Sequence, residues 1–312
     1  MLDDIRSQSG LTLVDQNGSG GIYQMRDATG DGTMTFCDLF PGVTLIYSDF
    51  HMESCESGFT TALDLFCVDY CREGRMEYPN RENTYSYVEA GDLKLDRRLE
   101  HQGHFSFPLS HYHGVTISFE LPRAAASIGE EMRAFPVDLC ALRDKFCAGR
   151  FPQVIHGAPS IEHIFHELYA VPDKIRRPYC KLKVLELLLY LDALELPSDE
   201  KPYFYRSQVE KVKAAEKLMR SDLERRYTLE ELSARFQIPQ TALKACFKSV
   251  FGSPVNAYMR QTRVNAAALA LRTERDKSVA EIGGRMGYDS ASKFAAAFKA
   301  VKGKTPQEYR NE

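Results

Sequence analysis

Two histidines separated by one residue form a group whose types and spacing could bind a metal. His111 and His113 flank Tyr112 in a β-rich stretch, and the alternation of side chains along a strand would place both imidazoles on one face. Imidazole nitrogens bind transition metals, and a carboxylate often completes the set. In metal sites with this His-x-His pattern the Glu follows closely, whereas Glu120 lies seven residues after His113. We therefore expect surface or loop histidines, and we predict neither a metal nor a cofactor.

Motifs for other chemistry are missing from the sequence. It contains neither the GxxxxGK[ST] loop of nucleotide sites nor the GxSxG elbow of hydrolases. Asp27–Gly32 lacks the ligand spacing and terminal Glu of a calcium loop and predicts a turn. Eight cysteines without paired CxxC spacing predict free thiols in a reducing cytoplasm. No run approaches the ~18 apolar residues of a membrane span. We predict a cytoplasmic protein that is not an enzyme and does not bind a membrane.

Charge is distributed unevenly along the chain. Residues 206–312 contain 21 Lys and Arg and 12 Asp and Glu, a net charge of +9, and residues 1–205 carry −12. A basic C-terminal third attached to an acidic remainder favours a polyanionic partner for the C-terminal part only. Chance unevenness would give the same numbers, so charge alone does not decide the partner.

Two short helices joined by a tight turn are expected between residues 229 and 251. The turn lies at Gln237–Pro239, and the small residue Ser233 stands where the second helix must cross the first. This combination is the signature of a helix-turn-helix motif. The apolar residues at helical spacing are Leu229, Leu232, Phe236, Leu243, Phe247 and Phe251.

The same arrangement recurs after residue 278. Gly283 stands at the helix crossing, Gly287 forms the turn and Ser290 is suited to the N-cap of the following helix. Its apolar positions are Val279, Ile282, Met286, Phe294, Phe298 and Val301. A helix expected over residues 254–272, with Pro254 at its start, would be about 27 Å long. That length can place the two second helices roughly one DNA turn, ~34 Å, apart.

Residues 206–310 resemble the DNA-binding domain of the AraC/XylS family of bacterial transcription regulators. The resemblance rests on GYDSASKFAAAFKAVKGKTPQEYR, which carries the Gly-aromatic, Phe, Phe-Lys, Gly, Thr-Pro and Tyr-Arg pattern of the family. Two residues depart from a favourable pattern. Gln237 stands where Gly or a small polar residue is usual, and Gly284, inside a helix, costs about 1 kcal/mol relative to Ala.

The resemblance places the exposed N-terminal half of each second helix in the major groove. Lys can donate to guanine, Gln pairs with adenine and Thr contacts the thymine methyl, while flanking lysines contact phosphate. Because the second motif is rich in Ala, we expect the first to make most base contacts. The candidates are Gln240, Thr241, Lys244 and flanking Lys248 in the first motif, and Ser290, Ser292, Lys293 and flanking Lys299 and Lys302 in the second.

The N-terminal two thirds is expected to be β-rich and then helical. Residues 1–32 are rich in Gly, Asp and Ser and predict a flexible arm plus a turn, whereas 33–120 predict short strands in a barrel or sandwich. Strands are expected at 43–50, 62–69, 84–88 and 114–120, and helices at 136–148, 159–170 and 175–196.

The helix at 175–196 is apolar on more than one face, so a second subunit could cover one of them. Charged substitutions at Leu188 or Leu191 would test that interface.

This N-terminal part resembles the cupin-like sensing domain that precedes such DNA-binding units. The resemblance implies an α+β multidomain protein, with a cupin-like β-barrel at 1–125, a helical dimerisation or bridge region at 126–200, and a DNA-binding domain at 206–312 whose motifs span 229–250 and 279–302. Polar residues that could face an effector are His51, Glu53, Arg72, Glu73, Arg75, His104, His111 and His113, of which we select His51, Arg72, Glu73, His104 and His113.

We predict a sequence-specific transcription regulator controlled by a small-molecule effector. Its expected partners are double-stranded DNA, RNA polymerase, the effector and a second copy of the chain. Two alternatives remain. A cupin-type metal enzyme with a DNA-binding tail would hold stoichiometric iron or zinc at His111 and His113, and a ligand-free regulator would have a filled, inaccessible barrel core.

Overall fold

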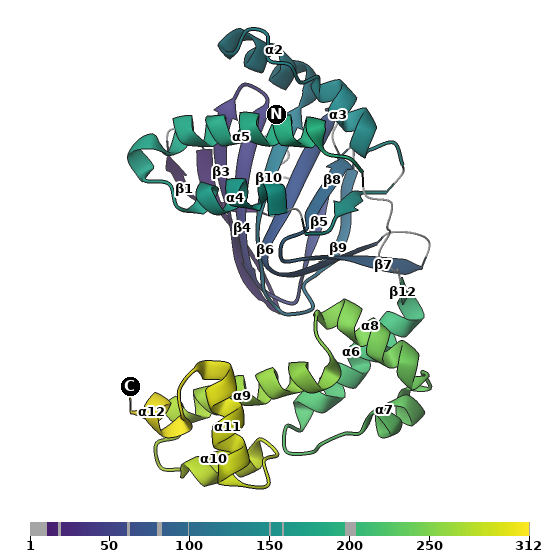
Figure 1. Cartoon of the computed structure of the whole chain (residues 1–312), viewed down its shortest axis with the longest axis vertical. Coiled ribbons are helices and arrows are strands. Elements are labelled where there is room, and N and C mark those ends of the chain that lie inside the picture. Colours follow the sequence, from purple (N-terminus) through teal and green to yellow (C-terminus); the bar gives the residue numbers. More distant parts are fainter. Residues whose placement is uncertain are drawn as a thin grey trace. The chain divides into compact units, whose positions relative to one another are not determined.

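The computed structural model describes residues 11–17, 20–60, 63–79, 83–98, 100–149, 151–157, 159–196 and 204–311. They form two compact units, residues 1–203 and 204–312 (Figure 1). The first is a sheet covered by helices and the second is helical, as the α+β prediction requires. No helix among these described residues combines the length and the apolar character that crossing a membrane requires.

The sheet of the first unit is antiparallel, with the order β1-β2-β3-β4-β10-β6-β7. β6 also pairs with β8 and β9, β8 with β11, and β9 with β5. The strands are β1 Thr12–Asn17, β2 Gly20–Asp27, β3 Gly30–Phe40, β4 Val43–His51, β5 Ser54–Thr60, β6 Leu65–Pro79, β7 Thr84–Glu89, β8 Leu93–Arg97, β9 Glu100–Ser106, β10 Tyr112–Glu120 and β11 Gln153–Ile155.

The prediction of a flexible arm over residues 1–32 is wrong for the residues that the structure describes there. Residues 12–17 and 20–27 are strands β1 and β2, and β3 begins at Gly30. Glycines in these strands allow atoms of the neighbouring strands to approach the backbone closely. A Cβ at Gly20 would lie 1.8 Å from the carbonyl oxygen of Phe36, and one at Gly32 would lie 2.1 Å from the Phe50 ring. Residues 1–10 lie outside the described residues.

Two helices, α4 Pro159–Tyr169 and α5 Arg176–Ala193, lie across one face of this sheet, and α2 Leu121–Glu131 and α3 Leu139–Phe146 lie near one end of the strands (Figure 1). Alternate residues of the central strands, such as Val68, Tyr70 and Val115, share one buried core with these helices, and Tyr70 stacks on Phe165 of α4. The segment 126–200 therefore belongs to the same compact unit as the sheet.

The second unit begins at β12, Phe204–Tyr205, and is otherwise helical. Its helices are α6 Arg206–Ser221, α7 Leu229–Phe236, α8 Gln240–Phe251, α9 Val255–Thr273, α10 Val279–Arg285, α11 Ala291–Lys302 and α12 Pro306–Arg310. The predicted helix at 254–272 is α9, which begins one residue later with Pro254 as its N-cap.

Candidate nucleic-acid interface

The first helix pair, α7 and α8, is built by local signals. Thr228 and Glu231 form a capping box, in which each side chain accepts a hydrogen bond from the backbone N–H of the other residue. The same contact to Thr228 holds the pKa of Glu231 below its ordinary value. Gln237 ends α7 in the left-handed region, with a φ of 49°, and Ser233 donates to the carbonyl of Ile238 at 2.8 Å. Gln237, which stands where Gly or a small polar residue is usual, therefore adopts a strained backbone conformation.

The second pair, α10 and α11, repeats this construction. Ser278 and Glu281 form a second capping box, and Gly287 makes the turn with a φ of 74°. Ser290 accepts from the backbone N–H of Lys293 at 3.3 Å, as expected of an N-cap. The core between the helices contains Ile282, Met286, Phe294 and Phe298, together with apolar residues of α9.

Two adjacent glycines in α10 have opposite surroundings. A Cβ at Gly283 would lie 2.8 Å from the buried Phe294 ring, whereas one at Gly284 would meet nothing within 4 Å. We expect Gly283→Ala to destabilise the C-terminal unit by about 1–3 kcal/mol through overpacking. Gly284→Ala should stabilise it by about 0.5–1 kcal/mol because it removes the entropic cost of a helical glycine. Urea unfolding of residues 204–312 measures both, and equal effects would contradict this account of the helix crossing.

The two pairs are joined through α9 and through the loop that follows α6. With 19 residues, α9 is about 28 Å long. The Arg263 guanidinium on α9 donates to the carbonyls of Leu223 and Arg225 at 2.9 and 3.0 Å, and Arg226 donates to the carbonyl of Gly287 at 2.7 Å. Burial and the neighbouring charge of Arg226 lower the pKa of Arg263. This loop thus fixes the second turn relative to the long helix.

Near the first pair, α9 is also held against α6. The Tyr258 hydroxyl donates to the buried Glu216 carboxylate at 2.8 Å. Burial, followed by the charge of Glu216, raises the pKa of Tyr258. The periodicity of the sequence did not predict these hydrogen bonds of α9 and of the loop after α6, because they join residues about 40 or more positions apart.

The predicted DNA-contacting side chains lie on the exposed surfaces of α8 and α11. Lys293 forms an exposed ion pair with Asp289 at 3.5 Å, and Ser290 is engaged as a helix cap. Gln240 and Lys302 are half-buried. The other exposed residues are Thr241, Lys244, Lys248, Ser292, Lys293 and Lys299. The arrangement presents cations and hydrogen-bonding groups from two helices carried by one unit.

In the N-terminal unit, the predicted effector residues lie at one end of the helix-covered face. His113 is half-buried, and His51, Arg72 and Glu73 are exposed. The Arg72 guanidinium lies 4.1 Å from the centroid of the Tyr169 ring. The side chain of His104 lies outside the described residues. Of the other candidates, Glu53 is exposed, and Arg75 is buried and pairs with Glu89 at 2.6 Å.

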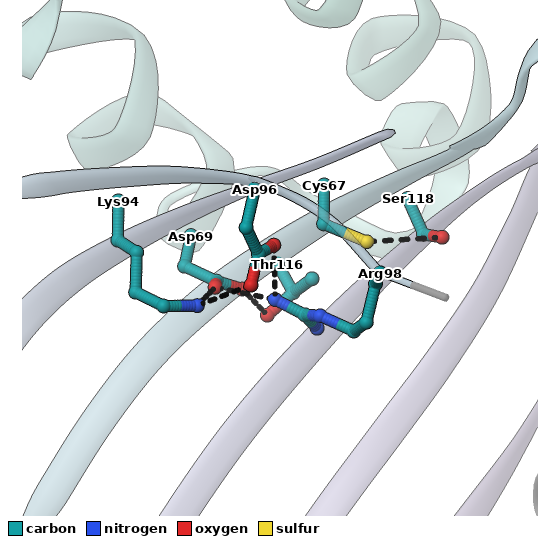
Figure 2. Close-up of polar contacts among 7 residues, drawn as sticks. All are labelled: Cys67, Asp69, Lys94, Asp96, Arg98, Thr116 and Ser118. Carbon is teal, nitrogen blue, oxygen red and sulfur yellow. Dashed lines mark hydrogen bonds and ion pairs between the residues drawn. The ribbon is translucent and has the colours of Figure 1, made fainter. Parts of the chain in front are cut away.

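The opposite face of the sheet carries a buried ionic network that sequence analysis missed (Figure 2). Asp69 accepts from Lys94 at 2.8 Å and from Arg98 and Thr116 at 2.6 Å. Asp96 accepts from the same two cations at 2.8 and 2.9 Å. Although burial alone would raise the pKa of Asp69, the charges of Arg98 and Lys94 hold it well below its usual range. The Nε of Arg98 is buried without a hydrogen-bond partner among the described residues.

A third polar group, Glu89, Asp92 and His156, is engaged in structural contacts. Asp92 accepts from the Glu89 backbone N–H at 3.0 Å and from that of Gly157 at 3.3 Å, and it contacts His156 Nδ1 at 2.9 Å. These bonds fasten the segment after β11 to the turn between β7 and β8.

The comparisons with known proteins concern mainly the C-terminal unit. A family model described as a helix-turn-helix domain matches residues 232–312. The F1 operon positive regulatory protein of Yersinia pestis is 38% identical over 68 residues, which cover 22% of this chain and 22% of that protein. A putative AraC-like transcription regulator of Streptomyces lividans is 26% identical over 173 residues, covering 52% and 57%. The chain therefore spans less than two thirds of the length of these relatives.

Among solved structures, the DNA-binding domain of AdpA in complex with a target DNA is 27% identical, with a TM-score of 0.31. The match covers 32% of this chain and 90% of that domain.

Proposed function

We propose that this chain, which belongs to the AraC/XylS family through its C-terminal DNA-binding domain, is a sequence-specific transcription regulator. The observation that carries the proposal is the pair of helix-turn-helix motifs on one unit, each presenting exposed lysines on its second helix. In this proposal α8 and α11 occupy successive segments of the major groove, and the flanking lysines contact phosphate. RNA polymerase belongs to the proposal as the partner whose action at a promoter would be changed.

The N-terminal unit, in this proposal, binds a small-molecule effector. An effector regulates only if it binds two arrangements of the protein with different affinity. The network around Asp69 supports a site on the sheet face away from α4 and α5, because Arg98 keeps an unpartnered buried donor there. A hydrogen-bond acceptor on the effector would suit that donor.

A homodimer is also part of the proposal. The two leucines named above are unsuitable for testing its interface, so other residues of α5 are needed. Leu188 and Leu191 are fully buried in the core of their own unit, so charge at either position would report unfolding. Leu182 and Leu189 are exposed at 63% and 44% and stand seven residues apart on α5. This spacing places them on one stripe of the helix, where a second copy could cover them.

We expect the wild type to sediment as a dimer at tens of micromolar and the Leu182→Asp/Leu189→Asp chain to sediment as a monomer. Its thermal stability should change little, because both side chains are exposed. Leu269→Asp, at a residue 66% exposed on α9, is the control and should leave the dimer intact. A monomeric wild type, or a variant that still dimerises, would contradict this interface.

The proposal for DNA predicts different effects for two lysines. Lys244 is exposed on the first half of α8, whereas Lys302 is the half-buried last residue of α11. Lys244→Ala should weaken binding to the preferred site by about 1–3 kcal/mol and relax the preference at one base pair. Lys302→Ala should weaken binding to all sequences similarly and reduce the salt slope by about one. Site selection from random duplexes supplies the preferred site, and titration against a scrambled duplex completes the test. Equal losses on both duplexes for Lys244→Ala would remove Lys244 from the base-contacting set.

A further inference from the structure

Three histidines from two neighbouring strands converge near one end of the helix-covered face. His51 ends β4, whereas His111 precedes and His113 lies within β10. The side-chain nitrogens available as ligands all lie within 4.8 Å of one another. The ring centroids of His111 and His113 are 4.5 Å apart, and that of His51 is 5.2 Å from His111.

Strand register explains why these side chains meet. Asp49 of β4 lies directly opposite His113 of β10, and His51 lies two residues further along β4. Alternation places Asp49 and His51 on the same face as Tyr47, whose hydroxyl donates to the carbonyl of Leu168 in α4. The group therefore stands on paired strands at the edge of the helical cover, and it is positioned by the backbone of the sheet.

Two carboxylates lie beside the imidazoles and supply negative charge there. Asp49 Oδ1 contacts Nε2 of both His51, at 3.0 Å, and His113. Glu73, opposite His113 on β6, lies 3.6 Å from Nε2 of His111. One carboxylate oxygen thus contacts two imidazole nitrogens, so these three donor atoms lie close enough together to share one cation. The two carboxylates would also balance the charge of a divalent ion.

We propose that His51, His111 and His113, with Asp49 as the fourth ligand, bind a divalent transition metal, and that the metal is zinc. Three imidazole nitrogens and one carboxylate oxygen form a donor set that suits tetrahedral Zn²⁺. The ligand atoms of such a site lie about 3.3 Å apart, so closure requires side-chain rotation and leaves the strands in place. The side chains of His111 and His113 are 29% and 26% exposed and that of His51 59%, so an ion can enter from solvent.

This site is distinct from that of a cupin metal enzyme. The third histidine comes from β4, and Glu120 lies at the far end of β10, about 23 Å along the strand from His113. The proposal concerns metal binding by the N-terminal unit and is independent of the DNA-binding proposal.

The test is a titration of the untagged, chelator-treated full chain with Zn²⁺ alone, followed by calorimetry and by equilibrium dialysis with metal analysis. We expect one ion per chain, and tetrahedral Co²⁺ should give intense visible d–d absorption in the same site. His113→Ala and His51→Ala should each weaken binding at least tenfold. Asp49→Asn should weaken binding as well, because it removes the anionic fourth ligand. The control is His166→Ala on α4, whose histidine is 59% exposed and pairs with Glu162 at 3.6 Å, and it should bind as the wild type does.

Circular dichroism in the presence of chelator separates lost ligands from lost folding. If His113→Ala fails to fold, the exposed His51→Ala variant decides the question. A wild type that takes up no more zinc than the His51→Ala/His113→Ala double variant would overturn the proposal. So would a loss in His166→Ala equal to that in His113→Ala.

Discussion

Replacing Asp69 with alanine should cost the N-terminal unit about 3–5 kcal/mol of unfolding free energy. Asp69 is buried between Lys94 and Arg98, which are themselves only 5% and 12% exposed. Without this carboxylate, two buried cations would share the single anion Asp96. Urea unfolding followed by circular dichroism measures the loss. Asp173→Ala removes an exposed ion pair with Arg176 and should change stability by less than about 1 kcal/mol.

Removing one cation together with Asp69 tests whether the cost arises from uncompensated charge. The Asp69→Ala/Arg98→Met variant leaves Lys94 and Asp96 as a balanced pair, so it should lose less than the sum of the two single variants. Additive losses would show that packing, and not charge, accounts for the effect.

Acid should weaken the same network. Because the folded pKa values of Asp69 and Asp96 lie below their ordinary values, these carboxylates stabilise the fold at neutral pH. That contribution is lost as the pH falls below the unfolded value of about 4. The Asp69→Ala variant should therefore show a shallower acid dependence than the wild type.

Most of the C-terminal unit could be predicted from the sequence because its signals are local. Helical periodicity, the turn at Gly287 and the N-cap at Ser290 all lie within one helix pair, and each is confirmed. The hydrogen bonds made by Arg263 and Arg226 were not predicted, because an arginine that donates to the backbone carbonyl of a distant residue leaves no pattern in the sequence.

The N-terminal unit was predicted less completely because its polar groups depend on strand register. His111 and His113 were placed on one face by alternation, but His51 joins them only through the pairing of β4 with β10. The network of Asp69, Lys94 and Asp96 likewise requires the pairing of β6 with β8. The strands before residue 33 were missed because glycines at close backbone approaches resemble glycines of a flexible arm.

Residues 204–312 alone should bind duplex DNA, with an affinity that falls steeply as salt rises. This fragment is a compact unit, and residues 206–312 carry the net charge of +9. Each phosphate neutralised contributes about −0.9 to the slope of log affinity against log salt. If the three flanking lysines each contact one phosphate, they contribute about −2.7 to the slope, and affinity should fall roughly 40-fold between 50 and 200 mM salt. Fluorescence anisotropy with a labelled duplex measures the slope.

The same measurement tests which residues generate that slope. Replacing the three flanking lysines with alanine should make the slope shallower by about 2.7, while thermal melting should show a folded unit because none of them is buried. The acidic fragment 1–203 is the control and should not bind. A folded 204–312 fragment without affinity for DNA at low salt would refute the proposed function. A triple-alanine variant that keeps the full slope would assign the phosphate contacts to other cations, such as the arginines of the loop after α6. The flanking lysines are Lys248, Lys299 and Lys302.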